Sequence, residues 1–122
     1  MQWNFKADRP IYAQLVEQIQ LRIVSGQYPP GVRLPSVREL AAEASVNPNT
    51  MQRALAELER HGLVYTQRTS GRFITEDQQL IESVRDNLAF EEIHEFLEQM
   101  RQLGYDTTET IAMLKKVSKE EF

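Results

Sequence analysis

The sequence predicts a mainly α-helical chain in which three helices and a two-stranded hairpin are followed by two C-terminal helices. Through most of the chain, apolar residues recur at steps of three and four, which is the period of an amphipathic helix. Two short runs, LVYTQ and RFIT, flank a turn at residues 68–71 and predict the hairpin. A length of 122 residues leaves room for one small domain with an appendage and for no large catalytic body.

The composition is that of an ordinary soluble protein, with 41% apolar and 26% charged residues. The chain has no cysteine, which excludes disulfides and thiolate metal sites. It shows neither the basic-then-apolar pattern of a signal peptide nor an apolar run near the roughly 20 residues that cross a bilayer. We therefore expect a cytoplasmic protein without a membrane partner.

The N-terminal part of the chain is expected to form an arm and a helix. Trp3 and Phe5 alternate with polar residues, and we expect both rings to cover the first helix or a partner subunit rather than to stack on bases. Pro10 can open a helix in its first turn, and Gly26 ends it. The predicted core stripe of this helix consists of Ile11, Leu15, Ile19 and Ile23, with Tyr12 and Val16 beside it.

Residues 35–63 carry the signals of two short helices joined by a tight turn. Ser36 and Glu39 have the spacing of a capping box, so the first of these helices starts at Ser36. Asn47 is a strong N-cap and Pro48 is tolerated at the first helical position, so the second helix starts there. The two apolar stripes are Val37, Leu40, Ala41 and Ala44 in the first helix, and Met51, Ala54, Leu55 and Leu58 in the second. With the hairpin after them, these helices predict a winged helix-turn-helix.

The first turns of the second helix present hydrogen-bonding side chains on their outward face. Asn49, Thr50, Gln52 and Arg53 can bond to base edges or phosphates, and no acid lies among them. The two acids of this helix come later, toward its C-cap glycine, Gly62. A helix that enters the major groove by its N-terminal end would therefore meet DNA with this polar set.

The net charge of −4 argues only superficially against nucleic acid, because the charge is unevenly distributed. The first 79 residues carry nine Lys and Arg against eight acids, whereas the rest of the chain carries five against ten. What matters for DNA binding is the local potential. Five arginines can lie on one face of a winged helix: Arg33, Arg38, Arg53, Arg68 and Arg72. The alternative is surface salt bridging, for example Arg38 with Glu43 or Arg53 with Glu57.

The C-terminal third predicts a long helix and a last short one. Apolar residues recur at helical steps over residues 80–103, with one interruption near residues 89–90, and Gly104 stops the helix. Asp106 with Glu109 forms a second capping-box-like start. Two amphipathic helices without a sheet or large domain over them need another surface, and the simplest is a second copy. We expect dimerisation through Ile81, Val84, Leu88, Ile93, Leu97 and Met100.

No pattern of a catalytic site is found in the sequence. Glu91 and His94 have the spacing of one di-iron ligand pair, but such a site needs a second pair, and His61 is the only other histidine. A nucleophile elbow and a glycine-rich phosphate loop are missing. We expect neither an enzyme nor a cofactor, and the acidic cluster of the tail is expected to keep its helix soluble.

The run at residues 31–64, GVRLPSVRELAAEASVNPNTMQRALAELERHGLV, resembles the DNA-binding domain of the GntR family of bacterial transcription regulators. The resemblance extends over residues 11–75. It implies that Gly71 enters the minor groove and that further DNA contacts come from Arg38, Pro48, Asn49, Thr50 and Gln52. Two positions depart from the family pattern: Thr69 stands where the wing usually has a first glycine, and Pro48 where many members have a base-reading arginine. We therefore expect the base preference of this protein to differ from that of other family members.

The short tail resembles that of the YtrA-type branch of this family, in which two C-terminal helices replace a large effector-binding domain and serve for dimerisation. This kinship also implies a role near genes for ABC-type transporters. The predicted organisation is a DNA-binding domain at residues 1–75 and a dimerisation segment at residues 76–122. Whether a small-molecule effector controls the protein stays open at this point.

The predicted function is that of a transcription regulator, expected to be a repressor, that binds a pseudo-palindromic double-stranded DNA operator as a homodimer and joins the nucleoid when bound. Arg33, Ser36 and Arg38 are expected to hold phosphates. The full predicted DNA-binding set is Arg33, Ser36, Arg38, Asn47, Pro48, Asn49, Thr50, Gln52, Arg53, Arg68, Ser70, Gly71 and Arg72. The alternative is a protein-interaction module that keeps the winged helix and docks on another protein through its acidic tail.

Overall fold

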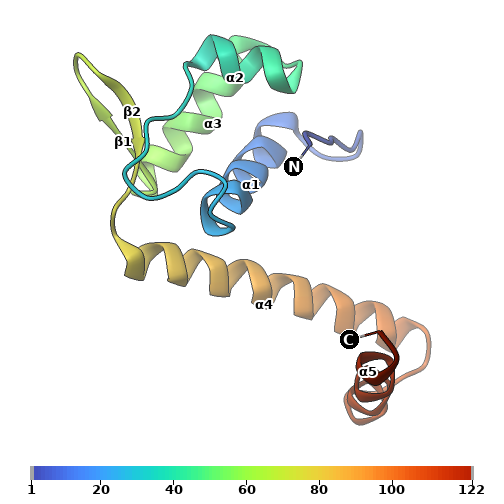
Figure 1. Ribbon diagram of the computed structural model, residues 1–122. Helices are drawn as coiled ribbons and strands as arrows, with labels where there is room; N and C mark the ends of the chain where they lie inside the picture. Colours follow the sequence, from blue (N-terminus) through green and yellow to red (C-terminus); the bar gives the residue numbers. More distant parts are fainter. Residues whose placement is uncertain (1, 122) are drawn as a thin grey trace. The chain divides into compact units, whose positions relative to one another are not determined.

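Five helices and one antiparallel hairpin make up the computed structural model, which describes residues 2–121 (Figure 1). In chain order the elements are α1 (Ile11–Val24), α2 (Val37–Ala44), α3 (Pro48–Arg60), β1 (Val64–Gln67), β2 (Gly71–Ile74), α4 (Gln78–Gln102) and α5 (Thr107–Glu121). The chain divides into two compact units, one up to Arg85 and one from Asp86 onward, and α4 contributes to both. The fold class is therefore the predicted one.

The core of the first unit is formed where α1 and α2 pack against α3. The predicted α3 stripe is confirmed, because Met51, Ala54, Leu55 and Leu58 are all buried. In α1 the stripe is buried except for Ile11, which is 38% exposed because it is the first residue of the helix and extends beyond the core. The prediction for Ile11 is therefore wrong. Each fully buried Leu or Ile of such a core contributes about 1.5 to 3 kcal/mol relative to an exposed one.

The two helix starts that the sequence predicted are built as expected. The hydroxyl of Ser36 accepts from the backbone N–H of Glu39 at 3.1 Å, and the Glu39 carboxylate accepts from the Ser36 N–H at 3.2 Å. Asn47 caps α3 by accepting from the N–H of Asn49 at 2.8 Å, with proline at the first helical position. Between the helices, Ser45 takes the left-handed conformation at φ 56°, which turns the chain sharply from α2 into α3.

The N-terminal arm lies along α1, as the sequence predicted. Trp3 and Phe5 are half-buried against the core, and Trp3 stacks on Arg22 with the guanidinium carbon 3.6 Å from the ring centroid. Gln14 is buried and fixes the arm's backbone, since its amide oxygen accepts from the Lys6 N–H at 2.7 Å and its amide N–H donates to the Lys6 carbonyl at 2.8 Å. The arm is thus part of the first unit's packing.

The wing is paired on both sides of β2. Antiparallel β1 lies on one side, in register from Val64↔Ile74 to Gln67↔Gly71. On the other side, Arg33 forms an isolated antiparallel bridge with Phe73, in which the Leu34 N–H donates to the Arg72 carbonyl at 2.8 Å and the Ile74 N–H donates to the Val32 carbonyl at 2.9 Å. The pairing fixes the wing to the segment that leads into α2.

The first turns of α4 belong to the first unit. Asp77 caps α4 by accepting from the Leu80 N–H at 3.1 Å, and Ile81, only 7% exposed, joins the core with Leu80 and Val84 at its edge. This differs from the prediction that Ile81 and Val84 serve dimerisation, because Ile81 has almost no surface left for a second copy. It also places the division between the units after Arg85, ten residues later than expected.

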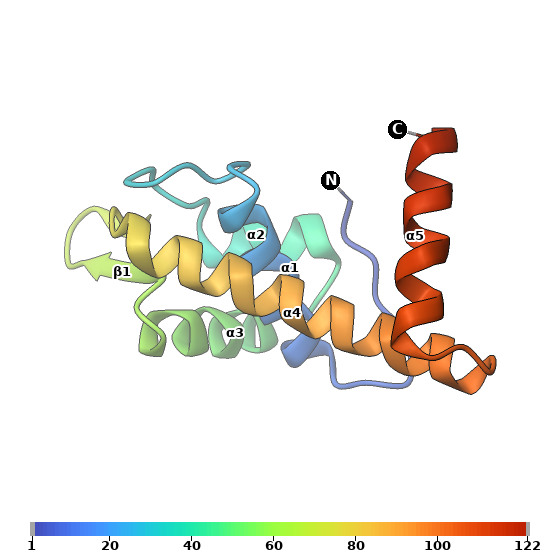
Figure 2. The ribbon, with the colours of Figure 1, turned by 90° about the horizontal axis from the view of Figure 1, so that it is seen from below.

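The second unit consists of the end of α4 and of α5, which runs in a different direction after a sharp turn (Figure 2). α4 continues as a helix through residues 89–90, where the apolar pattern is interrupted, and Gly104 turns the chain at φ 100°. The predicted second capping box is confirmed: Asp106 accepts from the Glu109 N–H at 2.8 Å, and Glu109 accepts from the Asp106 N–H at 3.1 Å. Within residues 86–120 no apolar side chain is fully buried.

Candidate nucleic-acid interface

The N-terminal half of α3 presents a polar surface above its buried stripe. Asn49, Gln52 and Arg53 are exposed, and Thr50 is partly so. The oxygen of the Asn47 side chain is occupied by capping, but its amide still has two N–H donors. This end of the helix carries the positive pole of the macrodipole, which favours an anionic partner. The structure therefore brings together the side chains that the sequence predicted for base contact.

The start of α2 and the segment before it supply the predicted phosphate contacts. Arg33, Ser36 and Arg38 are all exposed. The Ser36 hydroxyl accepts a bond from the backbone and keeps its own O–H as a donor. Hydrogen bonds from Ser36 hold the pKa of the Glu39 carboxyl below its ordinary value, so this acid stays ionised within the cap. Arg38 forms no ion pair with Glu43 in the described chain, contrary to the salt-bridge alternative.

Arg53 is held by an aromatic ring rather than by an acid. Its guanidinium carbon lies 3.7 Å from the centroid of the Tyr12 ring on α1. The carboxylate of Glu57, the predicted alternative partner, is instead bonded by Arg60 and lies 3.3 Å from the Nε2 atom of His61. The hydrogen bond from Arg60 lowers the pKa of Glu57. The charge of Arg53 thus remains available at the protein surface.

The wing turn carries Arg68 and Ser70, both exposed. Gly71 has φ 107°, a conformation that side chains disfavour, and a Cβ atom built on it would lie 2.9 Å from Nε of Arg33. Arg33 therefore lies against the wing backbone at Gly71. Arg72 differs from the other four arginines: its side chain is 21% exposed, and its Nε lies 3.9 Å from the Glu59 carboxylate.

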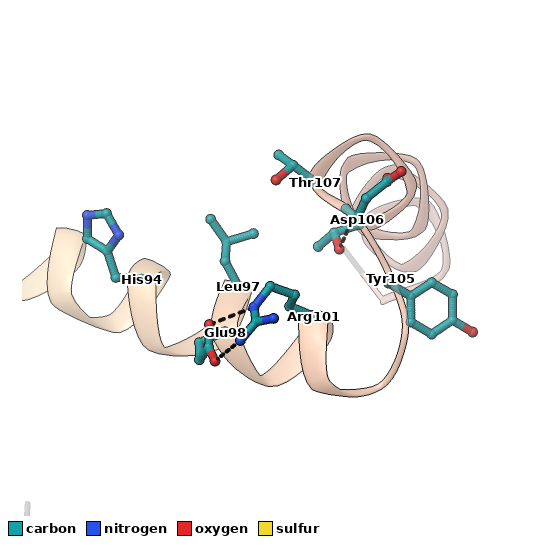
Figure 3. Close-up of a pocket in the computed structure, with 8 residues that line it drawn as sticks. His94, Leu97, Glu98, Arg101, Tyr105, Asp106 and Thr107 are labelled. Atoms are coloured by element: carbon teal, nitrogen blue, oxygen red, sulfur yellow. Dashed lines mark hydrogen bonds and ion pairs between the residues drawn. The ribbon is translucent and has the colours of Figure 1, made fainter.

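A shallow pocket of about 350 Å³ lies in the second unit, between the end of α4 and the start of α5 (Figure 3). His94 and Tyr105 line it, but Glu98 and Arg101 are paired with each other at 2.6 Å and Asp106 is used for capping. No three His, Cys, Asp or Glu side chains gather around a metal position anywhere in residues 2–121. None of the described helices is long and apolar enough to cross a membrane.

The arrangement of a helix-turn-helix and a basic wing agrees with a family comparison. Residues 11–74 match the profile of the bacterial regulatory proteins of the gntR family. The chain belongs to the GntR family. Members of the GntR family are DNA-binding transcription regulators and not enzymes, so the expectation of a non-enzymatic regulator is confirmed.

Two curated GntR relatives come from Bacillus subtilis. The chain is 41% identical to the HTH-type transcriptional regulator YhcF over 92% of its own length and 93% of the relative. It is 43% identical to the HTH-type transcriptional repressor YtrA over 59% of its own length and 55% of the relative. The likeness to YhcF therefore includes the tail, whereas the likeness to YtrA covers 72 residues.

Two solved structures extend the comparison to the GntR fold. A GntR family transcriptional regulator from Listeria monocytogenes is 43% identical, covers 92% of this chain and 98% of its own, and superposes with a TM-score of 0.84. The DNA-binding domain of AraR, solved in complex with operator ORX1, is 28% identical, covers 59% of this chain and 93% of its own, and has a TM-score of 0.55.

Proposed function

We propose that this chain is a transcription repressor that binds a specific operator as a homodimer. The observation that carries the proposal is the exposed N-terminal half of α3, where Asn49, Gln52 and Arg53 stand at the positive end of the helix with no acid among them. The relatives support it, since YtrA is named a repressor and the AraR domain was solved with an operator. In this proposal the protein acts in the cytoplasm, where it is bound to chromosomal DNA.

The side chains divide into two groups by their chemistry. The amide side chains of Asn49 and Gln52 have the donor and acceptor pattern that bonds an adenine edge in the major groove. Arg33, Ser36 and Arg38 offer hydrogen-bond donors at the start of α2 and just before it, which suits phosphate oxygens. In this proposal α3 reads the sequence, and the start of α2 with the wing fixes the register of the protein on the duplex.

Dimerisation is proposed to occur through the second unit. Its apolar side chains are left on the surface: Phe90 is 60% exposed, Ile93 52%, Leu103 72% and Ile111 47%. A pair of helices with no buried apolar side chain of its own needs a partner to cover it. A second copy is the simplest partner, and its two-fold symmetry would give a pseudo-palindromic operator with half-sites about 34 Å apart. The predicted dimerisation residues that lie in this unit are Leu88, Ile93, Leu97 and Met100, and all four are exposed or partly exposed.

We further propose that the chain belongs to the YtrA-type branch of the family. Support comes from the identity to YtrA over the DNA-binding region and from the short tail of two helices in place of a large domain. By kinship with this branch, the regulated genes would encode ABC-type transporters. The shallow pocket beside Tyr105 is lined by the Glu98–Arg101 ion pair and by the carboxylate of Asp106 that caps α5, and no effector class is proposed.

The division between base reading and phosphate contact gives the first prediction. Gln52→Ala should relax the preference at one base pair by about 1 to 3 kcal/mol, because one bidentate contact is lost. Arg38→Ala should weaken binding to all sequences alike. Titrations of both variants against the operator and its single-base changes measure this difference. If Arg38→Ala altered the preferred sequence and Gln52→Ala did not, the two roles would be exchanged.

Selection of bound fragments from a random DNA pool tests the proposed function itself. The full-length protein should enrich one sequence with two half-sites related by a dyad, because each protomer presents one α3. Enrichment of a single unrepeated half-site would contradict binding as a homodimer, but it would still agree with a sequence-specific DNA-binding regulator. A pool that stays random after repeated rounds would contradict sequence-specific binding.

A further inference from the structure

The contact between Tyr12 and Arg53 joins the first turn of α1 to the exposed face of α3. We infer that Tyr12 is a positioning residue whose ring presents the Arg53 guanidinium to a DNA phosphate at the edge of the major groove. This inference rests on the proposed function and deepens it. Its basis is the 3.7 Å separation between the guanidinium carbon and the ring centroid, together with the exposure of Arg53.

The choice of an aromatic partner preserves the charge. A carboxylate would neutralise Arg53 and occupy its N–H groups, but Glu57 on α3 is hydrogen-bonded by Arg60 instead and lies 3.3 Å from Nε2 of His61. Stacking uses only the flat face of the guanidinium, whereas its five N–H donors point outward in the plane. Arg53 forms no ion pair within the described chain. The ring therefore orders the side chain and leaves its donors ready for an anion.

The stack on Tyr12 favours a phosphate over a base as the partner of Arg53. Successive α-helical residues are turned by about 100°, so Asn49 points almost directly away from the buried stripe, with Gln52 about 60° to one side of it and Arg53 about 40° to the other. The stack places Arg53 on the flank next to α1. When α3 lies in the major groove, the side of the helix opposite the buried stripe faces the bases. The side of the helix next to α1 faces the sugar-phosphate backbone. Arg53, which the sequence analysis grouped with the base-reading residues, is thus assigned to the phosphate contacts.

The ring also lowers the entropic cost of the contact. A free arginine side chain samples many rotamers and loses this freedom when it binds. Tyr12 is half-buried on a helix that the core fixes through Leu15 and Ile19, so its ring is a rigid platform. An exposed stack of this kind corresponds to about two- to fivefold in affinity for one half-site, and to about 4- to 25-fold for a dimer with two.

The test compares four variants of the full-length chain on the selected operator and on bulk DNA. Tyr12→Leu should weaken binding to both by the same factor of about 4 to 25 and should make the salt dependence shallower, because Arg53 is no longer ordered. Tyr12→Phe is the matched control: it keeps the ring and should bind as the wild type does. Arg53→Ala should weaken binding further, and adding Tyr12→Leu to it should change nothing more.

A readout without DNA checks the stack itself. The δ protons of Arg53 should show an upfield ring-current shift in NMR spectra of the wild type and Tyr12→Phe, and Tyr12→Leu should abolish it. If Tyr12→Leu lowers the melting temperature, Tyr12→Met replaces it, since methionine fills more of the same space without a ring.

Three outcomes would overturn the inference. One is an additive effect of the two substitutions, and another is a Tyr12→Leu protein that keeps the wild-type affinity. A loss in Tyr12→Phe as large as in Tyr12→Leu would assign the effect to the tyrosine hydroxyl instead. The proposed function fails separately, if the wild-type protein prefers no sequence at all.

Discussion

Affinity for the operator should fall by about 10³- to 10⁵-fold when the salt concentration rises from 50 to 200 mM. Four arginines of each protomer are exposed on the proposed interface: Arg33, Arg38, Arg53 and Arg68. A dimer would neutralise about eight phosphates with them, and each neutralised phosphate contributes about 0.9 to the slope of log K against log salt. Fluorescence-anisotropy titrations at several salt concentrations measure this slope.

Two variants make the salt experiment specific to the interface. Arg38→Gln should reduce the slope by about 2 for a dimer, because one phosphate contact is lost in each protomer. Lys116→Gln removes the same charge from α5 in the second unit and should leave the slope unchanged. An affinity independent of salt, or equal effects of the two substitutions, would refute the proposed binding face.

Ending the chain at Arg85 should leave a folded monomer that binds the operator at least about 100-fold more weakly than the full-length dimer. Coupling two DNA-binding units makes the second contact intramolecular, and avidity gains of this size are lost when the coupling is removed. The truncation keeps Ile81 in the core and removes the unit with the exposed apolar surface. Sedimentation and anisotropy of the two chain lengths measure the effect.

A point substitution in the full chain accompanies the truncation. Ile93 is 52% exposed, so Ile93→Asp should not disturb the fold of a single chain but should place a charge in the proposed interface. Ending the chain at Thr75 instead should cost about 2 to 5 kcal/mol of folding stability, because Ile81 leaves a cavity in the core. A shortened chain that still dimerises, or an Ile93→Asp protein that remains a tight dimer, would remove the second unit from this role.

The sequence predicted best the features that depend on neighbouring residues. The capping boxes at Ser36 and Asp106, the N-cap at Asn47 and the buried stripe of α3 are all present in the structure. Each depends on a spacing of three or four residues within one helix, which is visible in a linear sequence. The candidate base-contacting set on α3 followed from the same periodicity, since the side chains opposite the stripe must face outward.

The features that the sequence analysis missed depend on contacts between distant segments. The bridge between Arg33 and Phe73 of β2 joins positions about 40 residues apart, and no local pattern marks it. Tyr12 looked like a flank of the α1 core, and its role beside Arg53 became visible only when α1 was packed on α3. Ile81 was predicted to serve dimerisation, but it is buried in the core of the first unit. An apolar stripe in the sequence shows that a helix face is covered, but it does not identify the surface that covers it.

Competition binding at physiological salt tests the central claim most directly. Full-length protein bound to the selected operator is challenged with unlabelled operator and, separately, with bulk DNA of the same length. The proposed regulator should prefer its operator by about 10³-fold or more. Equal competition by bulk DNA would contradict the claim and favour a winged helix that serves as a protein-interaction module.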